Sequence, residues 1–274
     1  MSNQRLKSLI QTFAYDEKEK PSTSNSTISH PRISKPKPKP KPKPTTNSTT
    51  GSSNIKLPNL NPSLSSNLHI IFVGFNPGIQ SSIQQHHYAH HSNLFWKLFN
   101  QSQLLQKICD THQIPTSSDD KYLHTLLQKG SSHLDDWGLI KYGIGFTDLV
   151  LRCTKRAEEL SMVEKLENVP RLLQEFKSSK VENVVIVGKG IWEMIVKYIA
   201  QEIKVKLKLN KVNFIWGKVE VGNDEIYNSA IEWLNEKLER RTIVWVFPST
   251  SGLVGSMSYA NKLQLWNNLV DHIS

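Results

Sequence analysis

The chain contains little cysteine and no long apolar run. Only Cys109 and Cys153 occur among its 274 residues, too few for a disulfide framework or a cysteine-rich zinc site. No apolar stretch approaches the ~20 residues of a transmembrane helix, and the N-terminus lacks the apolar segment of a signal peptide. These absences predict a soluble intracellular protein with reduced thiols and no membrane contact. A hydrophobic content of 38% is enough for a core.

Acidic residues are outnumbered, and the imbalance is concentrated at one end. The formal net charge is +10, and residues 1–55 hold ten Lys/Arg against three Asp/Glu, which leaves 24 against 21 for the remainder. Residues 1–60 are expected to form a disordered basic tail, because Ser, Thr, Pro and Lys offer almost nothing to bury. Its Lys-Pro repeat, residues 35–44, is either a sequence-independent phosphate tether or a solubilising linker. The charge favours a nucleic acid as partner.

Residues 61–274 alternate apolar runs with helical periodicity. Strands are expected at 68–73, 181–187 and 242–247, a loop entry at 143–148, and helices at 94–105, 120–129, 161–177, 190–200, 223–239 and 258–273. The alternation predicts a three-layer α/β/α domain with a mostly parallel central sheet. The acidic helix at 223–239 is expected to serve packing.

Two motifs directly follow expected strands. The first is Gly74-Phe75-Asn76-Pro77-Gly78, with Tyr88 and Asn93-Leu94-Phe95-Trp96 after it; the second is Pro248-Ser249-Thr250-Ser251-Gly252-Leu253. Carboxyl ends of strands are where open α/β sheets bind ligands. The Asn76 amide cannot take a proton, but it can orient a water and hydrogen-bond a substrate. It therefore suits a reaction whose leaving group departs largely unaided.

In this order and spacing, the two motifs resemble those of the mismatch-specific uracil and thymine-DNA glycosylases, most nearly a fungal-like thymine-DNA glycosylase of the uracil-DNA glycosylase superfamily. The resemblance covers roughly residues 68–268. It implies a monomeric nuclear enzyme without metal or cofactor, which flips uracil or thymine mispaired with guanine out of double-stranded DNA and hydrolyses its N-glycosidic bond to start base-excision repair. Residues 222–239 look like an insertion relative to the family. The competing class is a non-catalytic DNA-binding or interaction protein that retains the fold.

The resemblance also implies roles for individual residues. Asn76 would hold the attacking water, and Lys189 would bind a DNA phosphate. The base pocket would contain Phe75, Ser81, His87, Tyr88 and Asp148, with Tyr88 stacking on the flipped base. The intercalating loop would contain Ser249, Thr250, Ser251, Gly252 and Leu253, with Leu253 as the wedge. No lysine lies in these motifs, so no lyase activity is implied.

Several residues allow other interpretations. Asp148 stands where the vertebrate thymine-DNA glycosylases carry an Asn that helps to read the base, so it could change base choice, act as a general base, or merely cap a helix or a loop. The histidines at 86, 87, 90 and 91 lack a cysteine or helical His-x-x-x-His frame, which disfavours a metal site. Residues 4–15 are similar to the short peptides that replication clamps bind, although Lys7 replaces the usual glutamine; a fraying helix is the alternative.

Overall fold

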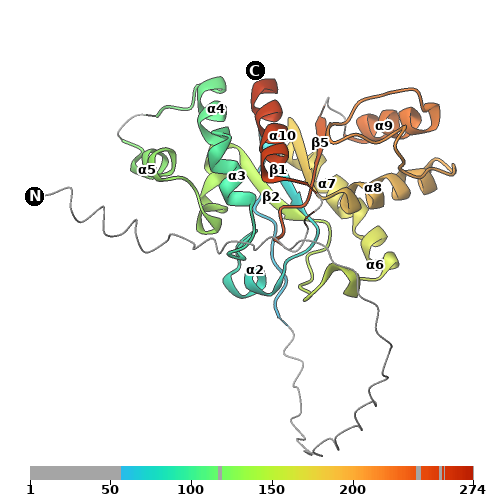
Figure 1. Ribbon diagram of the computed structural model, residues 1–274, viewed down its shortest axis with the longest axis horizontal. Coiled ribbons are helices and arrows are strands. Elements are labelled where there is room, and N and C mark those ends of the chain that lie inside the picture. The colour runs from blue at the N-terminus through green and yellow to red at the C-terminus, as the bar shows by residue number, and fades with distance from the viewer. Residues whose placement is uncertain (1–56, 117–118, 239–241, 253–254, 256, 274) are drawn as a thin grey trace, which may run out of the picture. The chain divides into compact units, whose positions relative to one another are not determined.

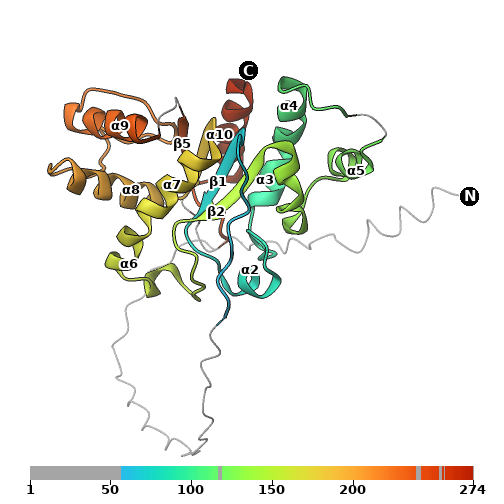
Figure 2. The same ribbon diagram turned by 180° about the vertical axis from the view of Figure 1, so that it is seen from behind.

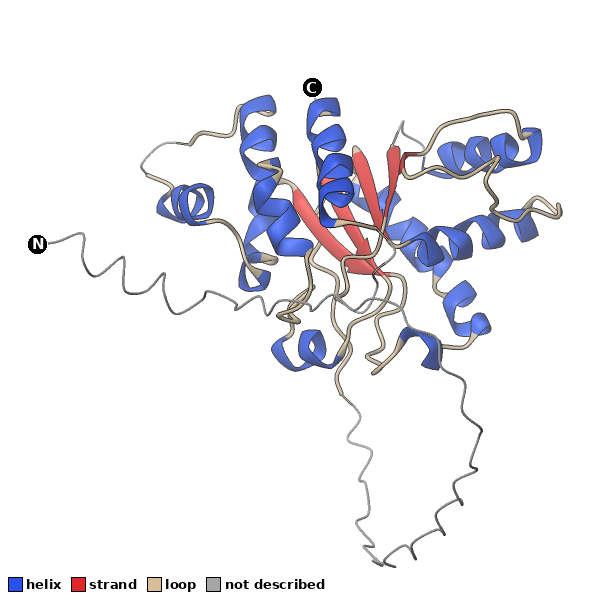
Figure 3. Cartoon of the chain, viewed as in Figure 1, coloured by secondary structure: helices blue, strands red, loops and turns tan. Residues whose placement is uncertain are grey.

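A computed structural model describes residues 57–116, 119–238, 242–252, 255 and 257–273. Its sheet has five strands in the order β2-β1-β3-β5-β4, and only β4 runs antiparallel to its neighbour. The strands lie at the centre of the domain between helices (Figure 3). Their bounds are β1 (Ile70–Gly74), β2 (Ile144–Asp148), β3 (Asn183–Val187), β4 (Gly217–Lys218) and β5 (Ile243–Phe247). The predicted three-layer, mostly parallel architecture is confirmed.

Successive strand residues enter two separate hydrophobic layers, as the two faces of a strand require. Ile71 and Val73 of β1 pack with α7 (Val169–Ser179), α8 (Lys189–Glu202) and α9 (Glu225–Leu238). Ile70 and Phe72 pack into the opposite layer. That layer contains α3 (Phe95–Gln101), α4 (Leu104–Thr111), α5 (Lys121–Lys129) and α10 (Tyr259–His272). The two groups of helices lie on opposite sides of the sheet in both views (Figures 1 and 2).

Two of the predicted helices are interrupted. The helix expected at 94–105 ends at Gln101, because Gln103 takes a left-handed backbone conformation (φ 57°) before α4 begins. The helix expected at 161–177 divides into α6 (Met162–Glu167) and α7, whose first turn contains Pro170. Proline has no N–H to donate, so it begins a helix more easily than it continues one. Ser161 and Ser258 cap α6 and α10 as their sequences suggest.

The segment 143–148 is a strand, not the loop entry expected from its glycines. Residues 144–148 form β2 and pair in parallel with β1, Ile144 opposite Ile70 and Asp148 opposite Gly74. Gly145 is required there because a Cβ would lie 2.6 Å from the side chain of Leu68. Ser63 pairs with Phe146 and covers the outer edge of β2. Crowding from neighbouring chain segments therefore explains a glycine that looks like a turn signal in sequence.

The acidic helix α9 packs through Tyr227, Ala230, Ile231, Leu234 and Leu238 against α7 and α8. Ile226, expected on its apolar face, is instead exposed. Short helical turns complete the chain: α2 (Ile79–Gln84), η2 (His133–Asp135), η3 (Gly138–Tyr142) and η4 (Ala157–Glu159). None of the described helices is long and apolar enough to cross a membrane. The predicted tail up to residue 56, with its clamp-like peptide, lies outside the described residues.

Candidate functional site

The sequence motifs meet at one edge of the sheet. Because β1, β2, β3 and β5 are parallel, the residues that follow them emerge together. The N–H of Leu94 donates to the carbonyl of Thr250 over 2.9 Å. Gly252 lies so close to Ser92 that a Cβ would be 2.6 Å from its hydroxyl oxygen. The second motif is thus fastened to the segment that follows the first.

The Asn76 side chain is held by its amide nitrogen. Nδ2 donates to Thr154 Oγ1 over 2.7 Å and to the Arg152 carbonyl over 3.1 Å, with a longer contact of 3.4 Å to the Pro77 carbonyl. These acceptors assign nitrogen and oxygen to the two ends of the amide. Oδ1, the end that remains, is a hydrogen-bond acceptor suited to a water molecule.

The partners of Asn76 are themselves fixed. Arg152 forms a two-point ion pair with Glu164, with Nε–Oε1 2.7 Å and Nη2–Oε2 2.9 Å, and this contact lowers the pKa of Glu164. Thr154 is buried, and its hydroxyl donates to the Arg156 carbonyl over 2.7 Å. The hydroxyl oxygen is therefore left as the acceptor for Asn76. This bracing keeps the orientation of the amide constant.

Asp136, which was absent from the sequence prediction, organises the histidines of the first motif. Its fully buried carboxylate lies 2.7 Å from His86 Nδ1 and 2.8 Å from His87 Nδ1, and it accepts the N–H groups of His87 and Trp137, each over 2.8 Å. Burial raises the pKa of Asp136, but the hydrogen bonds from His87 and His86 outweigh burial and keep the pKa below its usual value. His87 Nε2 is buried without a described partner.

Tyr88 has a strained backbone, and its backbone N–H has no acceptor among the described residues. Its φ of 55° is in the left-handed region, which a non-glycine residue seldom occupies. The neighbouring backbone is pinned, because Trp96 Nε1 donates to the His87 carbonyl and the Ala89 N–H donates to Ser81 Oγ. Among described residues, the N–H groups of Phe75 and Tyr88 have no hydrogen-bond acceptor. They are available to a ligand's carbonyl oxygens.

The ring of Tyr88 lies parallel to Phe95 at a centroid distance of 3.9 Å. One ring face is thus covered, while the residue as a whole stays half-buried. The hydroxyl is buried without a described partner, and burial, reinforced by the charge of Asp148, raises its pKa. A flat ring with one face against the core is a suitable surface on which a planar base can stack.

Asp148 ends β2 and is 6% exposed. Burial raises the pKa of its carboxyl to about 6, although the charges of His87 and Arg171 pull it down. A Cβ on Gly74 would overlap Asp148 Oδ1 and lie 3.4 Å from Tyr88 Oη. The glycine of the first motif therefore lets a carboxyl and a phenol share the space above β1. Asp148 is not a helix cap, since it closes a strand.

The Asp148 backbone is held from α7. Arg171 Nη2 donates to the carbonyls of Asp148 and Leu149 over 2.7 and 2.8 Å. Arg171 also pairs with Glu175, which accepts the hydroxyl of Thr147 over 2.7 Å. The end of β2 is therefore fixed by side chains as well as by the sheet ladder.

The remaining predicted residues have supporting positions. Ser81 is buried and its hydroxyl accepts the Ala89 N–H over 3.2 Å, so it fastens the loop. Phe75 is half-buried against Gly190, and Lys165 Nζ lies 5.4 Å from its ring centroid. Lys189, the first residue of α8, lies 3.4 Å from Glu193 and 4.7 Å from the Phe214 ring centroid. It must leave these neighbours to bind a phosphate.

The second motif is anchored by a buried lysine. Lys262 of α10 is 2% exposed and donates to the Ser249 carbonyl over 2.7 Å; burial lowers its pKa. Ser249 Oγ accepts the Ser251 N–H over 3.3 Å. The Thr250 hydroxyl is buried without a described partner. Leu253, the predicted wedge, lies outside the described residues.

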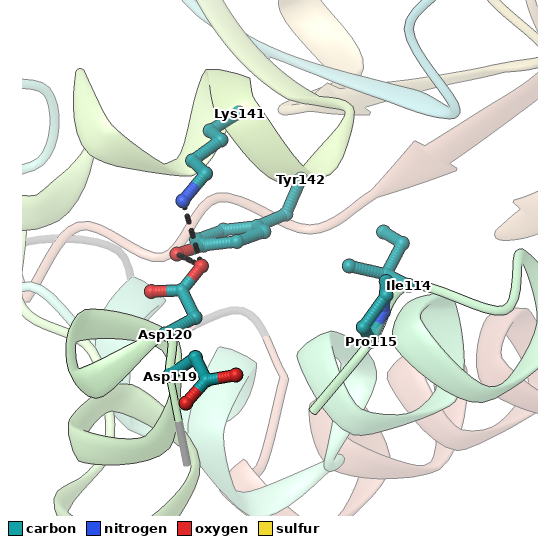
Figure 4. A pocket seen from close by; sticks show the side chains of 6 residues that line it. All are labelled: Ile114, Pro115, Asp119, Asp120, Lys141 and Tyr142. Carbon is teal, nitrogen blue, oxygen red and sulfur yellow. Dashed lines mark hydrogen bonds and ion pairs between the residues drawn. The ribbon is translucent and has the colours of Figure 1, made fainter. Parts of the chain in front are cut away.

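The histidines at 86, 87, 90 and 91 do not converge on one point. Asp136 binds the first two, whereas His90 and His91 are exposed and stack on one another at 4.4 Å. A hollow of about 380 Å³ lies at the other end of the sheet, lined by Ile114, Pro115, Asp119, Asp120, Lys141 and Tyr142 (Figure 4). None of the predicted site residues lines it.

Sequence reasoning missed the residues that hold the predicted ones. Asp136, Thr154, Arg171 and Lys262 support the site from other segments. Asp136 lies in a short acidic pair and Thr154 in a loop, so neither has a distinctive local pattern. Knowing that β1 and β2 are neighbours would have placed Thr154 near Asn76. Lys262 lies on the core-facing side of α10, and a lysine at such a position is the one feature of the sequence that could have indicated a buried supporting residue.

The chain is similar to known proteins over most of its described residues. The model of the uracil DNA glycosylase superfamily matches residues 62–270, and the chain belongs to that superfamily. It is 28% identical over 209 residues to the G/U mismatch-specific uracil DNA glycosylase of Schizosaccharomyces pombe. The alignment covers 76% of this chain and 51% of that protein. The chain thus spans about half the length of this curated relative.

Proposed function

We propose that the protein is a monofunctional DNA glycosylase that removes uracil, and more slowly thymine, mispaired with guanine in double-stranded DNA. The observation that carries this proposal is the fixed Asn76 amide, whose nitrogen binds Thr154 and Arg152 and whose oxygen is left as an acceptor. Membership of the superfamily and similarity to a G/U mismatch-specific enzyme support it. In cells, the reaction would start base-excision repair in the nucleus.

The chemistry requires a positioned water more than a strong base. Cleavage of an N-glycosidic bond passes through a transition state with positive charge on the sugar and negative charge on the leaving base. Asn76 Oδ1 can accept a hydrogen bond from water and aim it at the sugar carbon. It cannot remove the proton, so the rate depends on how readily the base leaves, and turnover is slow.

The surrounding groups suit a flipped pyrimidine. The open N–H groups of Phe75 and Tyr88 can donate to the base carbonyls, and the Tyr88 ring can stack on the base. Asp148 can accept the N3–H of uracil or thymine when it is ionised. Leu253 would fill the vacated space in the duplex, and Lys189 would bind a neighbouring phosphate. A mispaired base costs less to unstack, which favours mismatches.

A base-release assay tests the proposal. The full chain is incubated with duplexes containing G·U, G·T or A·U and with single-stranded uracil DNA, and abasic sites are revealed by alkali. We expect strand breaks for G·U first and G·T second, with none before alkali. DNA binding without abasic sites, in wild type as in Asn76→Ala, would instead identify a non-catalytic binding protein.

A further inference from the structure

Three potential metal ligands meet at the amino ends of β1 and β3, the sheet edge opposite the site described above. His69 directly precedes β1, Glu182 directly precedes β3, and His112 follows the last residue of α4. Within the described residues, this is the group of His, Cys, Asp and Glu side chains whose donor atoms all lie within 4.8 Å of one another. None of the three takes part in the proposed reaction.

The two distances from the carboxylate to the histidine nitrogens are close to those within a coordination sphere. Glu182 Oε2 lies 3.4 Å from His69 Nδ1 and 3.7 Å from His112 Nε2. A tetrahedral Zn²⁺ with bonds of about 2.0–2.1 Å places its ligand atoms about 3.3–3.4 Å apart. His69 Nδ1 is also buried and makes no hydrogen bond to a described residue, despite the nearby carboxylate. In the tautomer with the proton on Nε2, His69 Nδ1 therefore has a lone pair that no described residue occupies.

The backbone fixes two of the three ligands in advance. The N–H of Glu182 donates to the Leu68 carbonyl over 3.1 Å, and that of Asn183 donates to the His69 carbonyl over 3.0 Å. These ladder bonds hold His69 and Glu182 side by side on neighbouring strands. The third ligand, His112, comes from a helix terminus and can adjust more easily.

We propose that His69, His112 and Glu182 form a Zn²⁺ site that ties the end of α4 to the sheet. Two imidazoles and a carboxylate are a donor set that suits zinc and leaves a fourth position for water. The three side chains are 23%, 21% and 36% exposed, so an ion and its water can reach them from solvent. The site is separate from Asn76 and would stabilise the fold without entering base release.

Zinc binding would change the distance between the His69 and His112 rings. The two imidazoles are stacked, with centroids 3.3 Å apart and 14° between their planes. Both rings can direct a lone pair at one ion only if their centroids move to roughly 5 Å. Zinc must therefore separate the rings, which changes the ring-current shifts of their C–H protons.

Zinc binding to the chelator-treated full chain tests the proposal. We expect one equivalent of Zn²⁺ by equilibrium dialysis, a higher melting temperature, and altered His69 and His112 proton resonances. His112→Ala and Glu182→Gln should each weaken binding at least ~100-fold, since each removes one ligand. His90→Ala and His91→Ala are matched controls, because they remove exposed histidines elsewhere, and should not change affinity.

A second measurement, base release, distinguishes a failure of the zinc proposal from a failure of the proposed function. Base release from G·U DNA by the His112→Ala protein reports that the variant is folded and should equal wild type. Should that variant fail to fold, Glu182→Gln provides the same comparison. The proposal is overturned if wild type takes up no zinc, or if the ligand variants keep wild-type affinity.

Discussion

The two ends of the sheet shift the pKa of a buried or paired aspartate in opposite directions. At the carboxyl end, burial raises the pKa of Asp148 to about 6. At the amino end, Asp120 accepts hydrogen bonds from Lys141, the Leu123 N–H and Tyr142, and its pKa falls to about 2 (Figure 4). The Asp120 carboxylate is paired and caps α5, whereas the Asp148 carboxylate is desolvated and has no ion-pair partner among the described residues. A paired carboxylate stabilises the fold, and a desolvated carboxylate with a raised pKa is typical of a functional site.

Buried polar atoms without described partners occur at both ends of the sheet, but they cluster at the carboxyl end. His69 Nδ1 is such an atom at the amino end, whereas His87 Nε2 and Tyr88 Oη are buried together beside Asp148. Each such group costs about 1–3 kcal/mol unless a ligand or water satisfies it. A structure selected for stability alone would pair them, as it pairs Asp120. Their presence at the edge where the motifs meet is the physical sign of a binding site.

The largest expected effect comes from Asn76→Ala. It removes the acceptor for water while leaving the backbone that contacts the base, so single-turnover base release from G·U DNA should fall by ~100-fold or more. DNA affinity should stay within about threefold, because the interaction matters in the transition state. Thr154→Val, which removes one acceptor of the Asn76 amide and the hydroxyl's bond to the Arg156 carbonyl, should have a smaller effect. Wild-type rates in the Asn76 variant would refute the assignment.

Asp136→Asn should reduce both stability and rate. The carboxylate lies within 2.8 Å of four polar groups, and an amide can accept only part of these hydrogen bonds while adding a donor that faces other donors. Removing one partner from such a buried network costs about 2–4 kcal/mol. Urea unfolding measures this loss. A change below about 0.5 kcal/mol would mean that the network does not organise His86 and His87.

Two substitutions test the contrast between the ends directly. Because the folded pKa of Asp148 is raised, its contribution to stability is present below pH 4 and lost as pH rises through about 6. Asp148→Asn should therefore stabilise the fold above pH 6 by up to about 3 kcal/mol and change little below pH 4.

The sign reverses for Asp120, whose folded pKa is lowered. Its contribution is present above pH 4 and is lost as pH falls through about 2, so Asp120→Asn should destabilise the protein at neutral pH. Urea unfolding of both variants between about pH 2 and 8 measures the two curves. If both substitutions changed the free energy of unfolding with the same sign and the same pH dependence, the proposed difference between the two ends would be wrong.

The smallest effect concerns base choice. A 5-carboxylcytosine brings a negative charge toward Asp148, so its excision should be poor at neutral pH and improve as pH falls below about 6. Asp148→Asn should raise carboxylcytosine excision relative to uracil, because the amide has no charge and can also donate. A rate ratio insensitive to both pH and substitution would show that Asp148 does not face the base.

Local pattern was enough to predict the layers and the motif positions. Apolar runs predicted β1, β3 and β5, and helical periodicity predicted where most helices lie, because both signals act within a few residues. The local pattern did not predict β2, because Gly145 looks like a turn residue in the sequence. The side chain that leaves no room for a Cβ there belongs to Leu68, which is far away in the chain. The local pattern also failed at Gln103, whose left-handed backbone breaks a continuous apolar stripe.

The sequence by itself determined that Asn76, Tyr88 and the 248–253 segment follow strands, and hence that they meet at one edge. Only the tertiary structure decided how they are held there. Asn76 is oriented by Thr154, and His87 by Asp136, through contacts that span 78 and 49 residues. Hydrogen bonds and desolvation depend on what lies within a few ångströms, irrespective of chain distance. The raised pKa of Asp148 and the position of Glu182 beside two histidines therefore appear only once the chain is folded.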